Sequence, residues 1–221
     1  MTEEAAKGLL LVMIGIDPVH EAELNDWYDV EHFPERMVCP GFLNGRRFTA
    51  VEGAPKYLAI YDLENPGVLH SAPYLEIAGP TRWTRRIAAR FAPIVRNVYV
   101  EIRPPVTQGE RLTGEGLLLV AIDVDPLHDA ELNRWYDEEH IAERMAIPGF
   151  LRARRFVARE GGPRYLALYD LDSPAVLESA AYRHAAGQGA TVLTRWMQRL
   201  FTPIIRNVYI PLRNQDAVPP A

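Results

Sequence analysis

Runs of apolar residues separated by polar turns predict a chain in which strands and helices succeed one another. Residues 9–16 are apolar without interruption, and a run of this length is typical of a buried strand. Asp17 and Pro18 follow as an N-cap and a proline at the first helical position, and the next turn carries two acidic residues. The pattern therefore predicts a helix from Pro18 to about Val38.

The remaining elements of this first pattern are two strands, a broken helical region and a last strand. Apolar runs at residues 42–51 and 56–63 flank a turn that contains glycine and proline, which predicts a hairpin. A second helical region is predicted from about residue 66 to residue 91, with a break near residues 79–80. Residues 96–102 are predicted to form the last strand.

The whole pattern occurs twice. The segment GLLLVMIGIDPVHEAELNDWYDVEH, which starts at Gly8, returns at Gly116 as GLLLVAIDVDPLHDAELNRWYDEEH. From Asp17 to Leu63, about two-thirds of the residues are identical to the residues 108 positions later. After Gly79 the second copy is two residues longer, and the spacing becomes 110. Each copy is long enough to fold as a domain, so the repeat indicates a tandem duplication and excludes a solenoid of short units.

The repeat also predicts the domain boundaries and the fold class. We expect a first repeat over residues 1–103, a linker over 104–114, a second repeat over 115–212 and a flexible tail over 213–221. Each repeat has the order β-α-β-β-α-β, which is the ferredoxin-like arrangement of the α+β class. Such a sheet has one face without helices, so we expect the two repeats to form an intramolecular pseudo-dimeric α+β barrel.

Composition and charge narrow the classes of partner. The chain is 48% hydrophobic and 24% charged, which is typical of a folded globular protein. Its formal net charge is −5, so it has no excess of basic residues for binding phosphates. We therefore expect a small-molecule ligand and no nucleic acid, and either a monomer with a pseudo-twofold axis or a further homodimer.

The sequence also predicts a cytoplasmic location. Cys39 is the only cysteine, which excludes an intramolecular disulfide and suits a reducing compartment, and its apolar surroundings predict that it is buried. The N-terminus begins with acidic residues, whereas a signal peptide begins with basic ones. The apolar run at residues 9–16 is too short to cross a bilayer, so no membrane partner is expected.

The segment LNDWYDVEHFPERMVCPGFLNGRRF, followed by PKYLAIYDLE, resembles the dimeric α+β barrel superfamily and is close to its EthD-like members. Many of those proteins carry a Tyr…His-x-Pro signature on the first helix, matched here by Tyr28, His32 and Pro34. The second copy keeps Tyr136 and His140 but has alanine in place of the proline. The resemblance implies the fold, and it implies several activities. The superfamily includes cofactor-free monooxygenases, cyclases, dehydratases, decarboxylases, isomerases and haem enzymes.

The predicted first helix of each copy carries the residues best suited to proton transfer. Asp29, His32 and Glu35 lie on one stripe of the helix, and Glu31 lies on the neighbouring stripe with the apolar residues. A histidine beside a carboxylate can titrate near neutral pH and move a proton. The candidate catalytic residues are therefore His32, Glu31, His140 and Glu139. The same charges would equally suit a solvated helix surface with paired side chains.

The predicted strands offer candidates for substrate binding. Tyr57 and Tyr61 have the same parity on one strand, and two phenols near an arginine could hold an oxyanion. Tyrosine on an alternating strand is also ordinary core material. Asn97 could complete a polar pocket from the last strand. The candidate substrate-binding residues are Arg47, Tyr57, Tyr61 and Asn97, and in the second copy Arg155, Tyr165, Tyr169 and Asn207.

Motifs for metals and phosphates are missing from the sequence. It contains no Cys-x-x-Cys, no His-Glu-x-x-His, no glycine-rich phosphate loop and no G-x-S-x-G elbow. We therefore predict no metal and no cofactor, although the resemblance leaves haem ligation by His32 or His140 open. The first hypothesis is a cofactor-independent enzyme of proton transfer that acts on a hydrophobic oxygenated or aromatic compound. The alternative is a non-catalytic ligand-binding or accessory protein.

Overall fold

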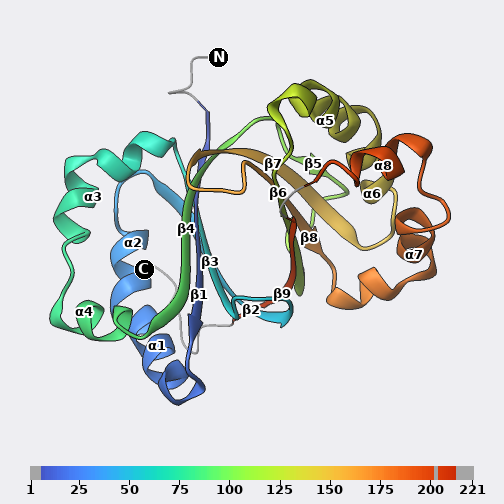
Figure 1. The fold of residues 1–221 in the computed structure, drawn as a ribbon. Coiled ribbons are helices and arrows are strands. Elements are labelled where there is room, and N and C mark those ends of the chain that lie inside the picture. The colour runs from blue at the N-terminus through green and yellow to red at the C-terminus, as the bar shows by residue number, and fades with distance from the viewer. Residues whose placement is uncertain (1–5, 202–203, 213–221) are drawn as a thin grey trace. The chain divides into compact units, whose positions relative to one another are not determined.

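The computed structural model describes residues 6–201 and 204–212, which divide into two compact units (Figure 1). Of these residues, 6–50, 54–100 and 211–212 belong to the first unit, and 51–53 and 101–210 belong to the second. Both units mix helices with an antiparallel sheet, so the predicted α+β class is confirmed. The tail predicted for residues 213–221 lies outside the described residues.

The first unit has an antiparallel sheet of order β4-β1-β3-β2. Its strands are β1 (Gly8–Ile16), β2 (Phe42–Glu52), β3 (Tyr57–Leu63) and β4 (Phe91–Glu101). Between β1 and β2 the chain forms a 3-10 turn (Pro18–His20), α1 (Glu21–Trp27), a π-helical turn (Tyr28–His32) and α2 (Phe33–Met37). Between β3 and β4 it forms a 3-10 turn (Pro66–His70), α3 (Ala72–Ile77) and α4 (Arg82–Ala88).

The second unit repeats this order and adds one short strand, so that its sheet has the order β9-β6-β8-β7-β5. Its strands are β5 (Val106–Thr107), β6 (Gly116–Ile122), β7 (Phe150–Glu160), β8 (Tyr165–Leu171) and β9 (Ile204–Pro211). The first helical segment contains a 3-10 turn (Pro126–His128), α5 (Asp129–Trp135), a π-helical turn (Tyr136–His140) and α6 (Ile141–Met145). The second contains a 3-10 turn (Pro174–Glu178), α7 (Ala180–Ala186) and α8 (Val192–Met197).

The first helical segment of each unit begins where its cap was predicted. The side chain of Asp17 accepts a hydrogen bond from the backbone nitrogen of Val19 at 3.0 Å, and Asp125 does the same for Leu127 at 2.9 Å. These bonds satisfy backbone donors that the first turn of a helix leaves without a partner. Each segment later widens into a π-helical turn, a feature that is frequent at functional sites.

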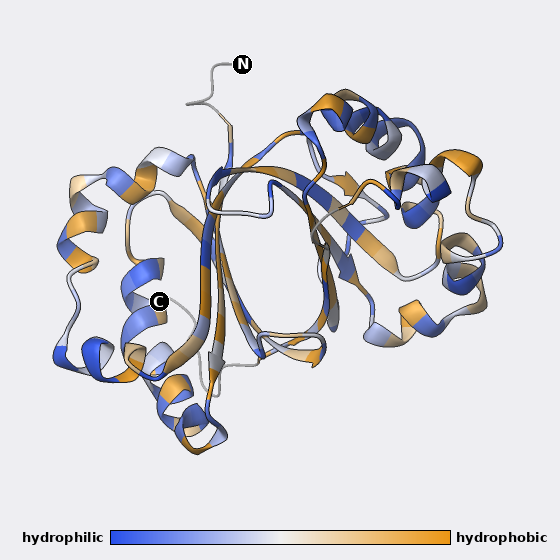
Figure 2. Ribbon diagram, viewed as in Figure 1, coloured by the Kyte–Doolittle hydropathy of each residue, from blue (hydrophilic) through white to orange (hydrophobic). Residues whose placement is uncertain are grey.

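Helices cover one face of the sheet in each unit (Figure 1), and the main apolar core lies between them and that face. In the first unit Leu10 pairs with Tyr61 on β3 and with Val98 on β4, and all three side chains lie in this core. The helices are striped with apolar and polar residues in Figure 2, as this one-sided packing requires. Cys39 is buried, which confirms the prediction.

Two predicted segments differ from the structure. The strand predicted over residues 96–102 is the longer β4, because its pairing with β1 extends to Ile16 and Phe91. The predicted linker contains β5, in which Val106 pairs with Ala153 and Thr107 with Arg152 on β7. This strand pairing holds the linker in place. Residues 101–107 thus belong to the second unit, although residues 101–103 were predicted to end the first repeat and residues 104–107 to begin the linker.

The predicted face-to-face packing of the two sheets stays a prediction.

Within the described ranges, no helix is both long enough and apolar enough to cross a membrane.

Candidate functional site

Arg155 on β7 is the centre of a polar group on the helix-covered face of the second sheet. Its guanidinium donates hydrogen bonds to Asp137 Oδ1 at 3.2 Å and to Asn133 Oδ1 at 2.9 Å. Its Cζ lies 4.0 Å from the centroid of the Tyr136 ring, within the range of a cation–π contact. Tyr136 and Asp137 lie three and four residues after Asn133, so both are neighbours of Asn133 on the surface of the helical segment. Arg155 is only 4% exposed, so its charge lies inside the protein.

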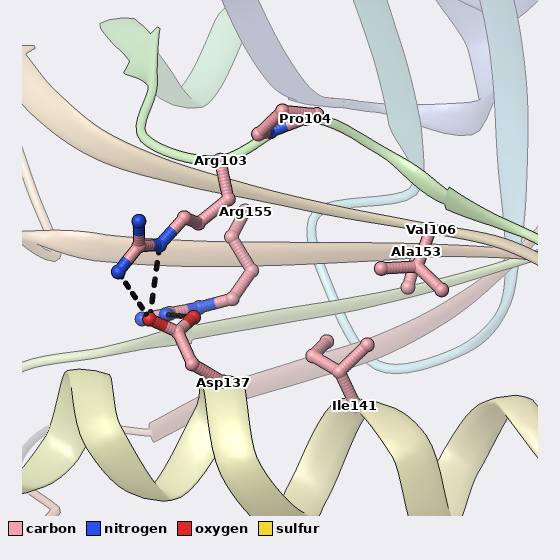
Figure 3. Close-up of a pocket in the computed structure, with 7 residues that line it drawn as sticks. All are labelled: Arg103, Pro104, Val106, Asp137, Ile141, Ala153 and Arg155. Carbon is pink, nitrogen blue, oxygen red and sulfur yellow. Dashed lines mark hydrogen bonds and ion pairs between the residues drawn. The ribbon is translucent and has the colours of Figure 1, made fainter.

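Arg103 brings a second guanidinium to the same carboxylate. Its Nε and Nη2 lie 2.9 and 2.8 Å from Asp137 Oδ2. Figure 3 shows Arg103 and Arg155 converging on Asp137 from two different segments of the chain. Two cations thus share one anion, and the group is well suited to attract a negatively charged oxygen of a ligand.

A cavity of about 260 Å³ lies beside this charged group. Its other wall is apolar, and in Figure 3 the side chain of Ile141 points from the helix toward Val106 and Ala153. A second cavity of about 290 Å³ shares Arg103 and Asp137 with the first. The first cavity is lined by Arg103, Pro104, Val106, Asp137, Ile141, Ala153 and Arg155. The second is lined by Ile102, Arg103, Asn133, Asp137, Val157 and Tyr165.

The first unit contains the same polar group. Arg47 donates to Asp29 Oδ1 at 2.5 Å and to Asn25 Oδ1 at 2.7 Å, and its Cζ lies 4.1 Å from the centroid of the Tyr28 ring. Burial raises the pKa of Tyr28 to about 12, although Arg47 and Arg36 oppose the rise. The pKa of Tyr136 is raised to about 12 in the same way by burial. Both phenols therefore stay protonated at neutral pH and can donate a hydrogen bond.

The two candidate histidines are stacked on tryptophan. The ring centroids of Trp27 and His32 are 4.2 Å apart, and those of Trp135 and His140 are also 4.2 Å apart. Burial, with the nearby charges of Arg36 and Arg47, lowers the pKa of His32 to about 3. Burial also lowers the pKa of His140 well below its ordinary value. Burial and the nearby arginines thus lower the pKa of both imidazoles, which is opposite to the predicted effect of a carboxylate. The catalytic role predicted for the histidines stays a prediction.

Glu31 and Glu139 point away from the histidines and join two helices. Glu139 Oε1 accepts hydrogen bonds from Thr194 at 2.7 Å and from the Trp135 indole at 3.3 Å. Glu31 Oε1 accepts the equivalent bonds, from the Thr84 hydroxyl at 2.9 Å and the Trp27 indole at 3.1 Å. Burial opposes ionisation, but such bonds hold the pKa of each carboxyl below its usual value. The catalytic role predicted for these two glutamates stays a prediction, and the structure gives each a bonding role between helices.

The predicted substrate-binding residues fall on both faces of each sheet. Arg47, Tyr57 and Tyr61 lie together on the helix-covered face, as do Arg155, Tyr165 and Tyr169. Asn97 and Asn207 lie on the opposite face, where each donates to a tyrosine hydroxyl two residues away, at 3.1 and 2.8 Å. The prediction that the asparagines complete the same pocket is wrong, because the neighbouring Val98 and Val208 fill the helix-covered positions.

Sequence reasoning missed several residues that line the first cavity. Arg103, Pro104 and Val106 were expected in or beside an exposed linker, and only the pairing of β5 with β7 brings them to the site. Ile141 and Ala153 are ordinary apolar residues of a helix and a strand. The only signal for them in the sequence is that they differ from Phe33 and Gly45 of the first copy.

The residues around the first cavity do not fit a haem group or a metal ion. None of the seven lining residues is a histidine, cysteine, methionine or tyrosine, which are the usual axial ligands of haem iron. Each candidate histidine is instead stacked on a tryptophan. Among the residues that the structure describes, no three His, Cys, Asp or Glu side chains gather as metal ligands do.

No protein-family model matches the sequence, and no curated protein is similar to it in sequence. Solved structures are similar over nearly the whole chain. An anthrone oxidase-like protein is 13% identical over 100% of this chain and 99% of that one, with a TM-score of 0.68. A chlorite dismutase variant from Candidatus Nitrospira defluvii is 11% identical over 94% and 92%, with a TM-score of 0.63. A monooxygenase-like protein from Listeria innocua is 9% identical over 96% and 98%, with a TM-score of 0.53. This likeness shows the fold alone.

Proposed function

We propose that the chain is a small-molecule enzyme that holds an apolar, oxygen-bearing organic compound between the first helical segment and the sheet of the second unit. The observation that carries this proposal is the cavity with two arginines at one end and an apolar wall opposite. Ligand pockets are usually apolar with a few polar groups that fix orientation. The solved structures of similar fold are described as oxidase-like, monooxygenase-like and chlorite dismutase proteins, which supports a reaction on a small molecule.

The chemistry we propose is proton transfer without a cofactor, such as cyclisation, isomerisation, dehydration or decarboxylation. Arg103 and Arg155 would stabilise the negative charge that develops on a substrate oxygen. The Tyr136 phenol, which stays protonated, would donate a hydrogen bond. We assign the proton acceptor to His140, whose Nδ1 is buried without a partner, although burial lowers the pKa of its imidazole. A bound anion would offset the charges of Arg144 and Arg155 and thereby make the imidazole more basic.

The family and the origin of the two repeats are part of the same proposal. We propose that the chain is an EthD-like protein in which tandem duplication has joined two subunits of a homodimer. The supporting observations are the repeat at a spacing of 108 residues and the same order of main elements in the two units. Light scattering after size-exclusion chromatography should then give the mass of one chain, 25.0 kDa.

The test of the proposed activity is a turnover assay. The purified chain is incubated with phenols, naphthols and aromatic β-keto acids, with and without oxygen, and products are identified by mass spectrometry. We expect a product that forms without oxygen and is lost in His140→Phe, whereas the matched variant His32→Phe in the first unit keeps the activity. Equal activity of His140→Phe and the wild type would contradict the role of His140.

One observation favours a second function, a binding protein without catalysis. Apart from its two arginines, the lining of the first cavity contains one charged residue, Asp137. Both arginines already donate hydrogen bonds to the Asp137 carboxylate. Saturable binding of a compound that the chain leaves unchanged would support this function and contradict the first.

A further inference from the structure

The two units differ at the apolar wall of the site. Ile141 and Ala153 line the cavity of the second unit, and at the repeat spacing of 108 residues they correspond to Phe33 and Gly45. A Cβ atom placed on Gly45 would lie 2.8 Å from Cε2 and Cζ of Phe33 and 2.8 Å from Sδ of Met37. The Phe33 ring and the Met37 thioether therefore fill the space directly above Gly45.

The second unit leaves that space available. Ala153 carries the methyl group that the Phe33 ring would not allow at Gly45, and Ile141 has no ring. The thioether does not distinguish the units, because Met145 stands where the first unit has Met37. The exchange of one ring for one branched aliphatic side chain is thus the difference between the units at the wall formed by the helix and β7.

Unpartnered polar atoms distinguish the units independently of the apolar wall. In the first unit Arg36 Nη1 donates to the backbone oxygen of Ile77 at 3.4 Å. In the second unit the corresponding Arg144 is 5% exposed, and its Nη1 has no hydrogen-bond partner. Nδ1 of His140 is also buried without a partner. Buried polar groups without partners are rare in proteins, so these two atoms mark a second difference between the units.

We propose that the second unit alone binds the ligand, so that one chain binds one molecule, and that the pairs Ile141–Ala153 and Phe33–Gly45 determine this. The inference rests on the proposed function and deepens it. The ligand class is a compound of one or two aromatic rings with a carboxylate or phenolate. A cavity on the order of 150 Å³ holds benzene, so the cavity of about 260 Å³ suits this size. The arginines account for the anionic oxygen.

The test exchanges the two pairs between the units. Isothermal titration calorimetry with 2-naphthoate measures the number of sites in the wild type, in Ile141→Phe/Ala153→Gly and in Phe33→Ile/Gly45→Ala. We expect one site in the wild type and an affinity at least about tenfold lower in the first double variant. The second double variant should gain a second, weaker site, because the described residues of the first unit include no counterpart of Arg103 and β5. Each double variant copies a pair that already folds in the other unit. Circular dichroism and urea unfolding check the fold of each variant.

The outcomes separate the inference from the proposed function. Two sites in the wild type, or unchanged binding in Ile141→Phe/Ala153→Gly, would overturn the inference and leave a ligand-binding protein. Absence of binding by 2-naphthoate, benzoate and 2-naphthol to the wild type would overturn the proposed function and the inference together. The cation 2-naphthylmethylammonium has the same rings, and binding as tight as that of 2-naphthoate would overturn the assignment of the anionic class.

Discussion

The Thr191 hydroxyl donates a hydrogen bond to the Glu139 carboxylate, with 2.5 Å between Oγ1 and Oε1. Thr191 also caps α8, because its side chain accepts a hydrogen bond from the backbone nitrogen of Thr194. One carboxylate thereby joins the first helical segment of the second unit to the start of α8. The same relationship holds in the first unit, where Thr81 donates to Glu31 at 2.7 Å.

Glu139→Gln should destabilise the protein. An amide cannot accept all the hydrogen bonds that converge on this carboxylate, and its NH₂ group would face the Trp135 indole or a hydroxyl. We expect the free energy of unfolding to fall by about 1–2 kcal/mol, measured by urea denaturation at pH 7. Glu138→Gln, at the exposed neighbouring position, should change it by less than about 0.5 kcal/mol. Equal stability of the two variants would show that the carboxylate network contributes nothing to the fold.

The histidines stacked on tryptophan should make the free energy of unfolding depend on pH at values above those at which carboxylates titrate. An unfolded histidine has a pKa of about 6.5, whereas that of His32 is lowered to about 3 in the folded protein. Below pH 6.5 the unfolded chain therefore binds more protons, so stability falls as pH falls toward the folded value. For His32 alone the loss should be about 2 kcal/mol between pH 6.5 and pH 5.

Urea unfolding at pH 7.5, 6.0 and 5.0 measures this dependence. His32→Phe should keep the stacking on Trp27 and remove the part of the pH slope that His32 contributes. The control is His20→Gln, in the first turn of the same helical segment and outside that aromatic stack. A slope in His32→Phe as steep as in the wild type would contradict the buried, neutral histidine.

Arg103→Gln should weaken ligand binding more than it weakens the fold. Its ion pair with Asp137 is largely exposed, and such pairs contribute at most about 1 kcal/mol to stability. Loss of a charged contact with the ligand should raise the Kd for 2-naphthoate roughly tenfold. Arg111→Gln is the matched control, since Arg111 forms an exposed ion pair with Asp172 from the same linker and does not line either cavity. If both variants bound 2-naphthoate equally well, Arg103 would not contact the ligand.

Gly149→Ala should destabilise the protein more than Gly109→Ala. Both glycines have positive φ, +96° and +75°, which L-residues with a side chain rarely adopt. A Cβ on Gly149 would also lie 2.4 Å from Cγ2 of Val176, whereas a Cβ on Gly109 would have no heavy atom within 4 Å. We expect a loss of about 1 kcal/mol at Gly109 from the backbone and about 1–3 kcal/mol more at Gly149 from the overlap. Similar urea midpoints for the two variants would show that the overlap is relieved without cost.

Most of the secondary structure could be predicted from the sequence because the local signals agree. Apolar runs, the caps at Asp17 and Asp125, and the broken second helical region all appear twice in the same order. The face of the sheet on which a side chain lies was harder to predict from the sequence. The parity of Asn97 matches that of Tyr99, but the alternation alone does not say which of the two sets faces the helices.

The candidate site was only partly predictable, because its charged end depends on tertiary contacts. The arginine of each polar group, Arg47 or Arg155, was found from its place beside the tyrosines. The position of Arg103 depends on β5 pairing with β7, which neither hydrophobic period nor turn residues indicate. The direction of Glu31 and Glu139 was also missed, because the threonines that bind them are some fifty residues away in the sequence.

Residues 101–107 belong to the second unit, so the boundary of the repeat in the sequence and the boundary of the compact unit in the structure fall at different residues. A fragment that begins at Gly116 contains the whole second repeat, yet it lacks Arg103, Pro104 and Val106, one wall of the first cavity. A fragment that ends before the second repeat carries those three residues without the strand that receives them. Dividing the chain at the boundary of the sequence repeat would therefore remove lining residues from the cavity. A division that keeps the whole lining of the cavity has to fall before residue 101.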